Sequence, residues 1–147
     1  MKIERFEDIN GWQMARELAR EVYASTESGN FSRDFGLKDQ IRRAAGSVMH
    51  NIAEGFDAGS DVEFTRFLRY AQRSCTEVQS ELYVALDQKY LNEQQFNKLY
   101  ELAKLAHCKI GGFIKYLKAP SVNLPSSTSP ITEQRTKDKG QRTKKID

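Results

Sequence analysis

The feature of the sequence that most constrains its fold is the absence of proline from the first 119 residues. All three prolines of the 147-residue chain, Pro120, Pro125 and Pro130, come after this stretch. Proline removes a backbone donor and collides with the preceding helical turn, so long helices require segments without it. The proline-free stretch therefore permits long helices, and its length is that of one domain.

Apolar residues recur every three or four positions in four segments of this stretch, which is the spacing of one face of an α-helix. We expect the first helix from about Asp8 to Ser25 and the second from about Asp34 to Ala58, with Gly59 closing it. The predicted core positions are Trp12, Ala15, Ala19 and Val22; Leu37, Ile41, Ala45, Val48, Ile52 and Phe56; Phe64, Leu68, Ala71, Cys75, Val78, Leu82 and Ala85; and Phe96, Leu99, Ala103, Ala106, Ile110, Phe113 and Leu117.

Capping signals indicate where the third and fourth helices begin. Ser60 followed by Glu63 has the spacing of a capping box, and Asn92 followed by Gln95 has the same spacing. No segment shows the alternation of a β-strand. We therefore predict an all-α protein, an antiparallel up-down four-helix bundle over residues 1–119.

The remaining residues, 120–147, differ sharply in composition. A segment rich in proline and serine is followed by a basic segment with almost no apolar side chain, and such a sequence cannot offset its ordering entropy. We expect a disordered tail. The tail also carries the net charge of +3, because residues 1–119 contain 17 basic and 17 acidic residues. The predicted bundle thus has no overall electrostatic preference for nucleic acid, although a local basic patch is compatible with it.

The sequence also bears on location and on cysteine chemistry. It contains no apolar run long enough to span a membrane, and its mixed-charge start is unlike a signal peptide, so we expect a cytoplasmic protein. Cys75 and Cys108 both fall on apolar stripes, which predicts free buried thiols.

The predicted helices carry more apolar residues than one core needs, which favours a second buried face and hence a homo-oligomer. These additional residues are Trp12, Phe35, Phe67, Tyr70, Tyr83, Tyr100, Leu102, Leu105, Ile114 and Tyr116.

Two polar stripes lie beside the apolar ones, and they are the most informative polar feature. One comprises Gln40, Ser47, Asn51 and Glu54 in the second helix, and the other comprises Tyr70, Ser74, Glu77 and Glu81 in the third. Buried polar groups are normally paired, so we expect a hydrogen-bonded network between the helices, with Arg42 or Arg43 taking part. A metal site is a weaker alternative, because His50 and Glu54, or Glu77 and Glu81, share a helical face but nitrogen ligands are too few.

Arginines define the second candidate surface. Arg66, Arg69 and Arg73 recur along the third helix, and Lys38, Arg42 and Arg43 lie on the second. Arginine suits phosphate because its planar group donates two hydrogen bonds together. These six residues either form a nucleic-acid-binding surface or make a solvated face with ion pairs such as Asp39 with Arg43. The sequence contains no P-loop and no Gly-x-Gly-x-x-Gly motif, so no cofactor is expected.

Several motifs together resemble one bacterial family. They are Phe35-Gly36-Leu37, Gln40, Arg42-Arg43-Ala44, Ser47, Asn51-Ile52-Ala53-Glu54-Gly55, Glu63-Phe64, Phe67-Leu68, Ser74-x-x-Glu77 and Glu81. Over roughly residues 5–118 the chain is similar to the four-helix-bundle proteins encoded in intervening sequences of 23S rRNA genes, the S23 type.

The resemblance implies small bundles that assemble into homopentamers, with no known enzymatic activity. It also implies a relation to accessory proteins of diversity-generating retroelements, which bind a reverse transcriptase and nucleic acid through a basic surface. The neutral predicted bundle departs from that branch, and the tail lies outside the family pattern. The hypotheses are therefore a non-enzymatic scaffold, pentameric as the resemblance implies, that contacts RNA or DNA backbone; a scaffold for a protein partner alone; and, as a third alternative, a metal-carboxylate bundle enzyme.

Overall fold

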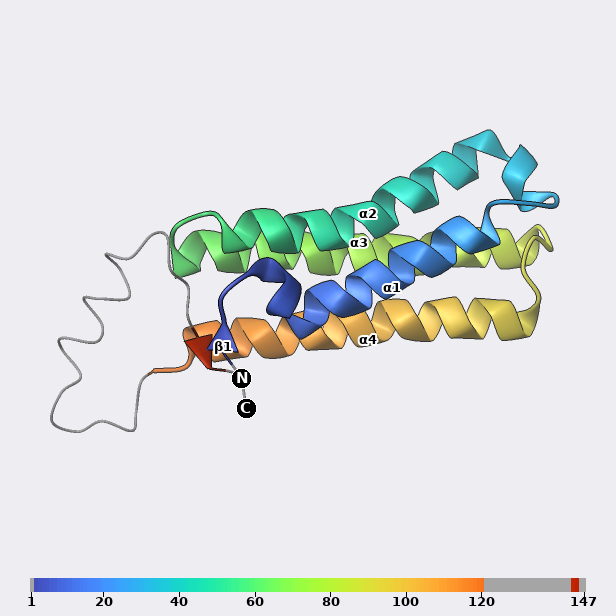
Figure 1. Cartoon of the computed structure of the whole chain (residues 1–147). Coiled ribbons are helices and arrows are strands. Elements are labelled where there is room, and N and C mark those ends of the chain that lie inside the picture. The colour runs from blue at the N-terminus through green and yellow to red at the C-terminus, as the bar shows by residue number, and fades with distance from the viewer. Residues whose placement is uncertain (1, 121–143, 146–147) are drawn as a thin grey trace, which may run out of the picture.

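The computed structural model describes residues 2–120, 144 and 145, and its helices form the predicted bundle (Figure 1). Helices that are neighbours in sequence pack against one another, and α1 also packs against α4, which closes the bundle. Short connections join the helices, so successive helices run in opposite directions (Figure 1). The elements are β1 (Lys2–Ile3), the 3-10 turn η1 (Phe6–Asp8), α1 (Asn10–Ser25), the 3-10 turn η2 (Phe31–Arg33), α2 (Phe35–Phe56), α3 (Asp61–Asp87), α4 (Glu93–Lys118) and β2 (Lys144–Lys145).

The core forms where the helical periodicity places it. Every predicted core residue of α3 and α4 is buried, and so are those of α2 except Phe56, which is partly buried. In α1 the buried face is rotated from the predicted one: Gly11 and Leu18 are buried, whereas Trp12 and Ala19 are only partly so. The shift reflects the segment before α1, because Phe6 packs edge-on against Trp12 with ring centroids 5.2 Å apart.

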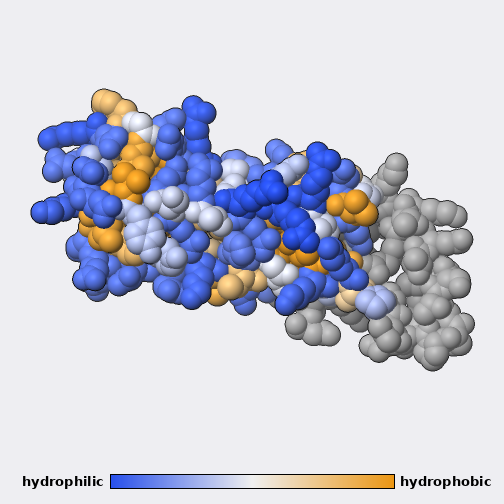
Figure 2. Space-filling view, turned by 180° about the vertical axis from the view of Figure 1, so that it is seen from behind, coloured by the Kyte–Doolittle hydropathy of each residue, from blue (hydrophilic) through white to orange (hydrophobic). Residues whose placement is uncertain are grey.

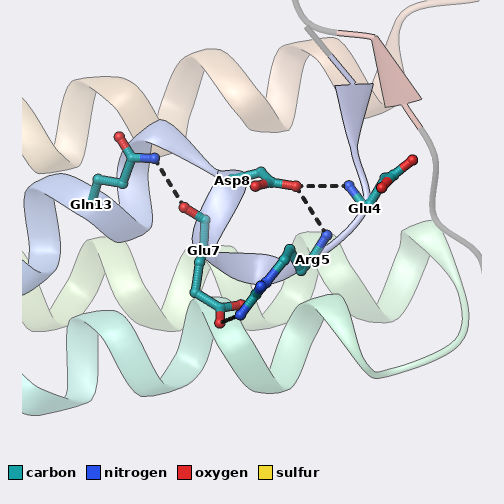
Figure 3. Close-up of polar contacts among 5 residues, drawn as sticks. All are labelled: Glu4, Arg5, Glu7, Asp8 and Gln13. Atoms are coloured by element: carbon teal, nitrogen blue, oxygen red, sulfur yellow. Dashed lines mark hydrogen bonds and ion pairs between the residues drawn. The ribbon is translucent and has the colours of Figure 1, made fainter.

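That segment also explains why α1 begins later than predicted. The carboxylate of Asp8 accepts hydrogen bonds from the amides of Glu4 (3.0 Å) and Arg5 (3.2 Å), as Figure 3 shows. Asp8 therefore closes the preceding 3-10 turn and does not start the helix. Gln13 donates to the carbonyl of Glu7 (2.9 Å), which ties the turn to the first turn of α1 (Figure 3).

Side-chain caps begin the other three helices. Asn92 and Gln95 form the predicted reciprocal box, since each side chain accepts from the other residue's amide, at 2.8 and 2.9 Å. Ser60 accepts from the amide of Glu63, as expected. Asp34 starts α2 by accepting from the amide of Leu37 (3.1 Å), and its second oxygen accepts from the Tyr90 hydroxyl (2.9 Å). Asp34 thereby joins the start of α2 to the α3–α4 loop.

One short strand pair was not anticipated. Lys2 and Ile3 pair antiparallel with Lys145 and Lys144, whereas the sequence showed no strand pattern. A two-residue strand is too short to produce an alternating pattern, and its partner is remote in sequence. The remainder of the expected disordered tail, residues 121–143 and 146–147, lies outside the described residues.

The two cysteines differ. Both are free, but only Cys75 is buried, whereas Cys108 is exposed, so the prediction of a buried thiol was wrong for Cys108. Burial raises the pKa of Cys75 to about 12.

In the described part of the chain, no helix is both long and apolar enough to cross a membrane.

The surplus apolar residues divide between core and surface. Ile114 is buried, and Trp12, Tyr100, Leu102 and Tyr116 are partly buried against the core. Phe35 (77% exposed), Tyr83 and Leu105 remain on the surface, together with Val62 and Val84. Figure 2 shows hydrophobic surface gathered at the end of the molecule away from the uncertain residues, where α2 begins and α3 ends.

Candidate functional site: a polar seam and an arginine row

A polar seam runs between α2 and α3, and it contains the core of the predicted network. Ser74, buried on α3, donates to the hydroxyl of Ser47 on α2 (2.9 Å). Asn51 lies one turn beyond Ser47 and donates to both its hydroxyl and its carbonyl, each at 2.9 Å. A hydrogen bond from a buried group on one helix to a half-buried group on the next favours one register, because slippage would leave the buried Ser74 hydroxyl without this acceptor.

Gly55 sets how closely the two helices approach at one end of this seam. A Cβ atom on Gly55 would lie 2.8 Å from the Cβ of Phe67 and 2.9 Å from the ring of Phe64. No alanine fits at that distance without movement of α3. The Asn-Ile-Ala-Glu-Gly motif thus combines Asn51, which forms hydrogen bonds within the seam, with Gly55, which allows α3 to pack closely against α2.

Glu81 marks the other end of the seam. Its side chain is buried on α3, 8% exposed, and its Oε1 has no hydrogen-bond partner among the described residues. Burial raises the pKa of Glu81 to about 7, and the charge of Glu77 and a hydrogen bond with that residue add to the shift. Glu77 lies one helical turn earlier and is exposed.

Two predicted members of the network on α2 lie outside it. Gln40 and Glu54 are exposed, and neither forms a hydrogen bond or ion pair with a described residue. Glu54 instead lines an open groove of about 590 Å³ along the outer face of α2. The groove is lined by Tyr23, Asp39, Arg42, Arg43, Gly46, Ser47, His50, Asn51 and Glu54.

Arg42 has a different role from the two that the sequence suggested. Its Nε donates to the hydroxyl of Thr26 (2.8 Å) and its guanidinium lies over the ring of Tyr23, 4.3 Å from the centroid. Its Nη2 also donates to the carbonyl of Tyr23 (3.4 Å). Thr26 is the C-cap of α1, so Arg42 binds the C-terminal end of that helix. The expected bond from Arg42 into the polar seam is absent, because the side chain points to α1.

Arg43 and Lys38 complete the basic residues of α2. Arg43 pairs with Asp39 across one helical turn (2.9 Å), as the spacing predicts, and does not enter the seam either. Lys38 is half-buried and makes no ion pair with a described residue.

The arginines of α3 form a row on its outward face. Arg66, Arg69 and Arg73 are all exposed. The ring of Tyr70 lies between two of them, 5.8 Å from the guanidinium carbon of Arg66 and of Arg73. Arg66 also pairs with Glu63 (3.4 Å) and donates to the Tyr70 hydroxyl (3.0 Å). Arg69 and Arg73 have no carboxylate partner among the described residues, so two positive charges of the row are not neutralised there.

The six candidate basic residues therefore do not gather in one place. Arg66, Arg69 and Arg73 share the outer face of α3, which we call the arginine row. Arg42 faces α1 and bonds to Thr26 and Tyr23 at the end of that helix. Sequence reasoning also missed the roles of Thr26 and Gly55; a glycine in the middle of an apolar helical face was the available signal for Gly55.

The acidic and histidine residues bear on the metal alternative. No group of three or more His, Cys, Asp or Glu side chains that could hold a metal ion occurs in residues 2–120. The pairs noted in the sequence, His50 with Glu54 and Glu77 with Glu81, are not joined by a third such residue there.

Comparisons with known proteins agree with this architecture. A crystal structure of a protein of unknown function, from the S23 ribosomal protein family of Bacteroides thetaiotaomicron VPI-5482, has a TM-score of 0.65 and 23% sequence identity. The alignment covers 71% of this chain and 98% of that one, and at this identity it supports the fold alone. None of the curated proteins matches the chain.

The sequence itself matches a family model over most of the bundle. The match spans residues 7–111, from the turn before α1 to the last third of α4, and includes the polar seam and the arginine row. Neither this family nor the matching structure carries a named enzymatic activity. The chain belongs to the family of 23S rRNA-intervening sequence proteins.

Proposed function

We propose that the protein is a non-enzymatic, homo-oligomeric scaffold, pentameric as the resemblance implies, whose arginine row contacts the phosphate backbone of RNA or DNA. The observation that carries the proposal is the row itself. It contains three outward guanidinium groups along one helix, two of them without a carboxylate partner in the described chain. Assembly would repeat the row around the oligomer and so multiply a patch that is weak on one copy.

Phosphate contact by such a row predicts binding that tolerates sequence changes and weakens with salt. The test is the anisotropy of a labelled structured RNA titrated with protein at about 50 and 200 mM salt, with oligomer mass measured by light scattering. The test variant is the double change Arg69→Gln and Arg73→Gln. Its matched control is Lys104→Gln and Lys109→Gln, which removes the same charge from exposed positions of α4.

The expected result is a loss of RNA affinity in the arginine variant only, with the mass of the oligomer unchanged. Equal losses in both variants would show a non-specific charge effect. If a chain that ends at Ala119 no longer binds RNA, the basic tail and not the arginine row is the binding site. A monomeric mass for the full chain would reject the scaffold proposal.

A second candidate is a scaffold for a protein partner, such as a reverse transcriptase, without a nucleic-acid role. It is favoured by the large apolar side chains that remain exposed, Phe35, Tyr83 and Val84 among them. Exposed apolar clusters are typical of protein interfaces. Absence of RNA binding by an intact oligomer would favour this candidate.

A further inference from the structure

Glu81 is a buried acid that forms no ion pair with any described residue. In the described part of the chain it is the only ionisable carboxyl group that is buried. Its Oε1 is sealed from solvent and accepts no hydrogen bond there. A buried carboxylate without a compensating charge or donor is costly, so such a group either acquires a partner or keeps its proton.

The helix packed against this face of α3 offers no charge to Glu81. The register set by Ser47 and Ser74 places residues 37–44 of α2 level with Glu81 and Glu77. The residues of this segment that face the core are apolar: Leu37, Ile41 and Ala44 are buried.

The charged side chains of the same segment are engaged elsewhere or lie apart. Asp39 and Arg43 pair with each other, and Arg42 binds the end of α1. Lys38 makes no ion pair with a described residue. Helix α4 packs against a different face of α3, where the side chain of Gln72 donates to the carbonyl of His107.

Among the described residues, the titratable group that raises the pKa of Glu81 is another acid, Glu77. Glu77 lies four residues earlier on α3, which places both carboxyl groups on one side of the helix, and a hydrogen bond joins them. Two carboxyl groups that share a site cannot both ionise cheaply. Glu77 is exposed and Glu81 is sealed at Oε1, so the inner group is the one that retains the proton.

We propose that Glu81 is uncharged while α2 is packed on α3, and that releasing its proton to solvent loosens the packing of the first turns of α2 on α3. The released state contains two carboxylates one turn apart, one of them beside the apolar side chains of α2. The protonated state contains one carboxylate, which accepts a hydrogen bond from the neutral acid.

The location makes local loosening the expected response. Phe35 and Val84 are 77% and 46% exposed, so two large apolar side chains at this end of the α2–α3 contact lie in solvent. Figure 1 shows the N-terminal part of α2 rising away from the other helices, whereas its C-terminal part runs along α3. A repulsion introduced here would act at the Glu81 end of the seam and leave the Gly55 end packed.

The direction of the pH effect follows from linkage. The pKa of Glu81 is raised from its ordinary 4.5 to about 7 in the folded protein. The closed seam therefore binds the proton more tightly than an opened one. Its stabilisation is complete below about pH 4.5 and is lost as the pH rises through 7.

The primary test is a carboxyl carbon NMR titration of the full-length protein, with all glutamates observed. We expect one glutamate, assigned as Glu81 by its loss in Glu81→Gln, to titrate near pH 7. In Glu77→Gln its midpoint should fall towards the ordinary range, although burial will keep it above that range. A wild-type protein in which every glutamate titrates below pH 5 would overturn the proposal, whatever the variants do.

Hydrogen exchange then tests the loosening. After correction for intrinsic exchange, the opening equilibrium of amides in residues 37–44 should rise about tenfold between pH 6 and pH 8. Amides near Ser47 and Gly55 should change much less. Glu81→Gln should abolish the local rise, whereas Glu101→Gln, which changes an exposed glutamate of α4, should preserve it. A uniform change along α2, or a rise that persists in Glu81→Gln, would contradict the proposed mechanism.

Discussion

Gly55 shows how one side chain, or its absence, sets the geometry of the seam. An alanine there must displace Phe67 or Phe64, since its Cβ would lie within 2.9 Å of both side chains. We expect Gly55→Ala to lower the free energy of unfolding by about 1–3 kcal/mol. The control is Gly112→Ala on α4, where an added Cβ meets nothing within 4 Å and the gain in helix propensity is about 1 kcal/mol. Urea denaturation of both variants measures the contrast; equal effects would show that the close approach is unimportant.

The two cysteines give a second prediction about single residues. The thiolate is the reactive form of cysteine, and burial raises the pKa of Cys75 to about 12, whereas Cys108 is exposed. A thiol reagent such as DTNB at pH 8 should therefore modify one thiol per native chain and both after denaturation. Cys108→Ser should abolish the native reaction, and rapid modification of two native thiols would show that Cys75 is accessible.

At the scale of the element, Arg42 joins two helices whose connection contains few other polar links. Replacing it with alanine would leave the Thr26 hydroxyl without its donor and remove the stacking on Tyr23. We expect Arg42→Ala to cost about 1–3 kcal/mol of unfolding free energy. Arg43→Ala is the matched control on the next residue, and loss of its exposed pair with Asp39 should cost less than about 1 kcal/mol.

Chemical denaturation at fixed pH distinguishes the two arginines. A large cost for Arg43→Ala and none for Arg42→Ala would reverse the assignment of roles. Because Arg42 acts on the fold, any RNA-binding defect of its variant should be read together with its stability.

The elements also show what could be predicted from the sequence. The core positions of α3 and α4 followed from helical spacing, since the apolar stripe of a helix in a bundle packs against the shared core. The Asn92 cap was predictable because its partners are three residues apart. The link from Arg42 to Thr26 was not, because it joins helices through contacts that no local pattern records. Likewise, Ser47, Asn51 and Ser74 were predicted to be a network, but their spacing does not reveal that Gln40 and Glu54 point to solvent.

At the scale of the whole molecule, the strand pair is the only described link between the tail and the rest of the chain. It joins Lys2 and Ile3 to Lys145 and Lys144, and two-residue strands contribute little by themselves. A chain that ends at Ala119 should therefore keep its helical circular dichroism and its melting temperature to within about 4 °C. A larger decrease in melting temperature would show that the tail stabilises the bundle. If the oligomer mass of the shortened chain by light scattering is unchanged, assembly does not depend on the tail.

The single tryptophan has a consequence for how this protein can be observed. Trp12 lies in the first turn of α1, against the ring of Phe6, with the guanidinium carbon of Arg16 5.9 Å from the centroid of its ring. In Figure 1, α1 begins in the half of the bundle that also holds the strand pair. The intrinsic emission of Trp12 will therefore follow the detachment of the N-terminal turn. The local opening of α2 near Glu81 takes place in the other half of the bundle and should not change the tryptophan emission. Agreement between tryptophan emission and far-ultraviolet dichroism would thus demonstrate cooperative unfolding of the bundle, while leaving a local opening of α2 undetected.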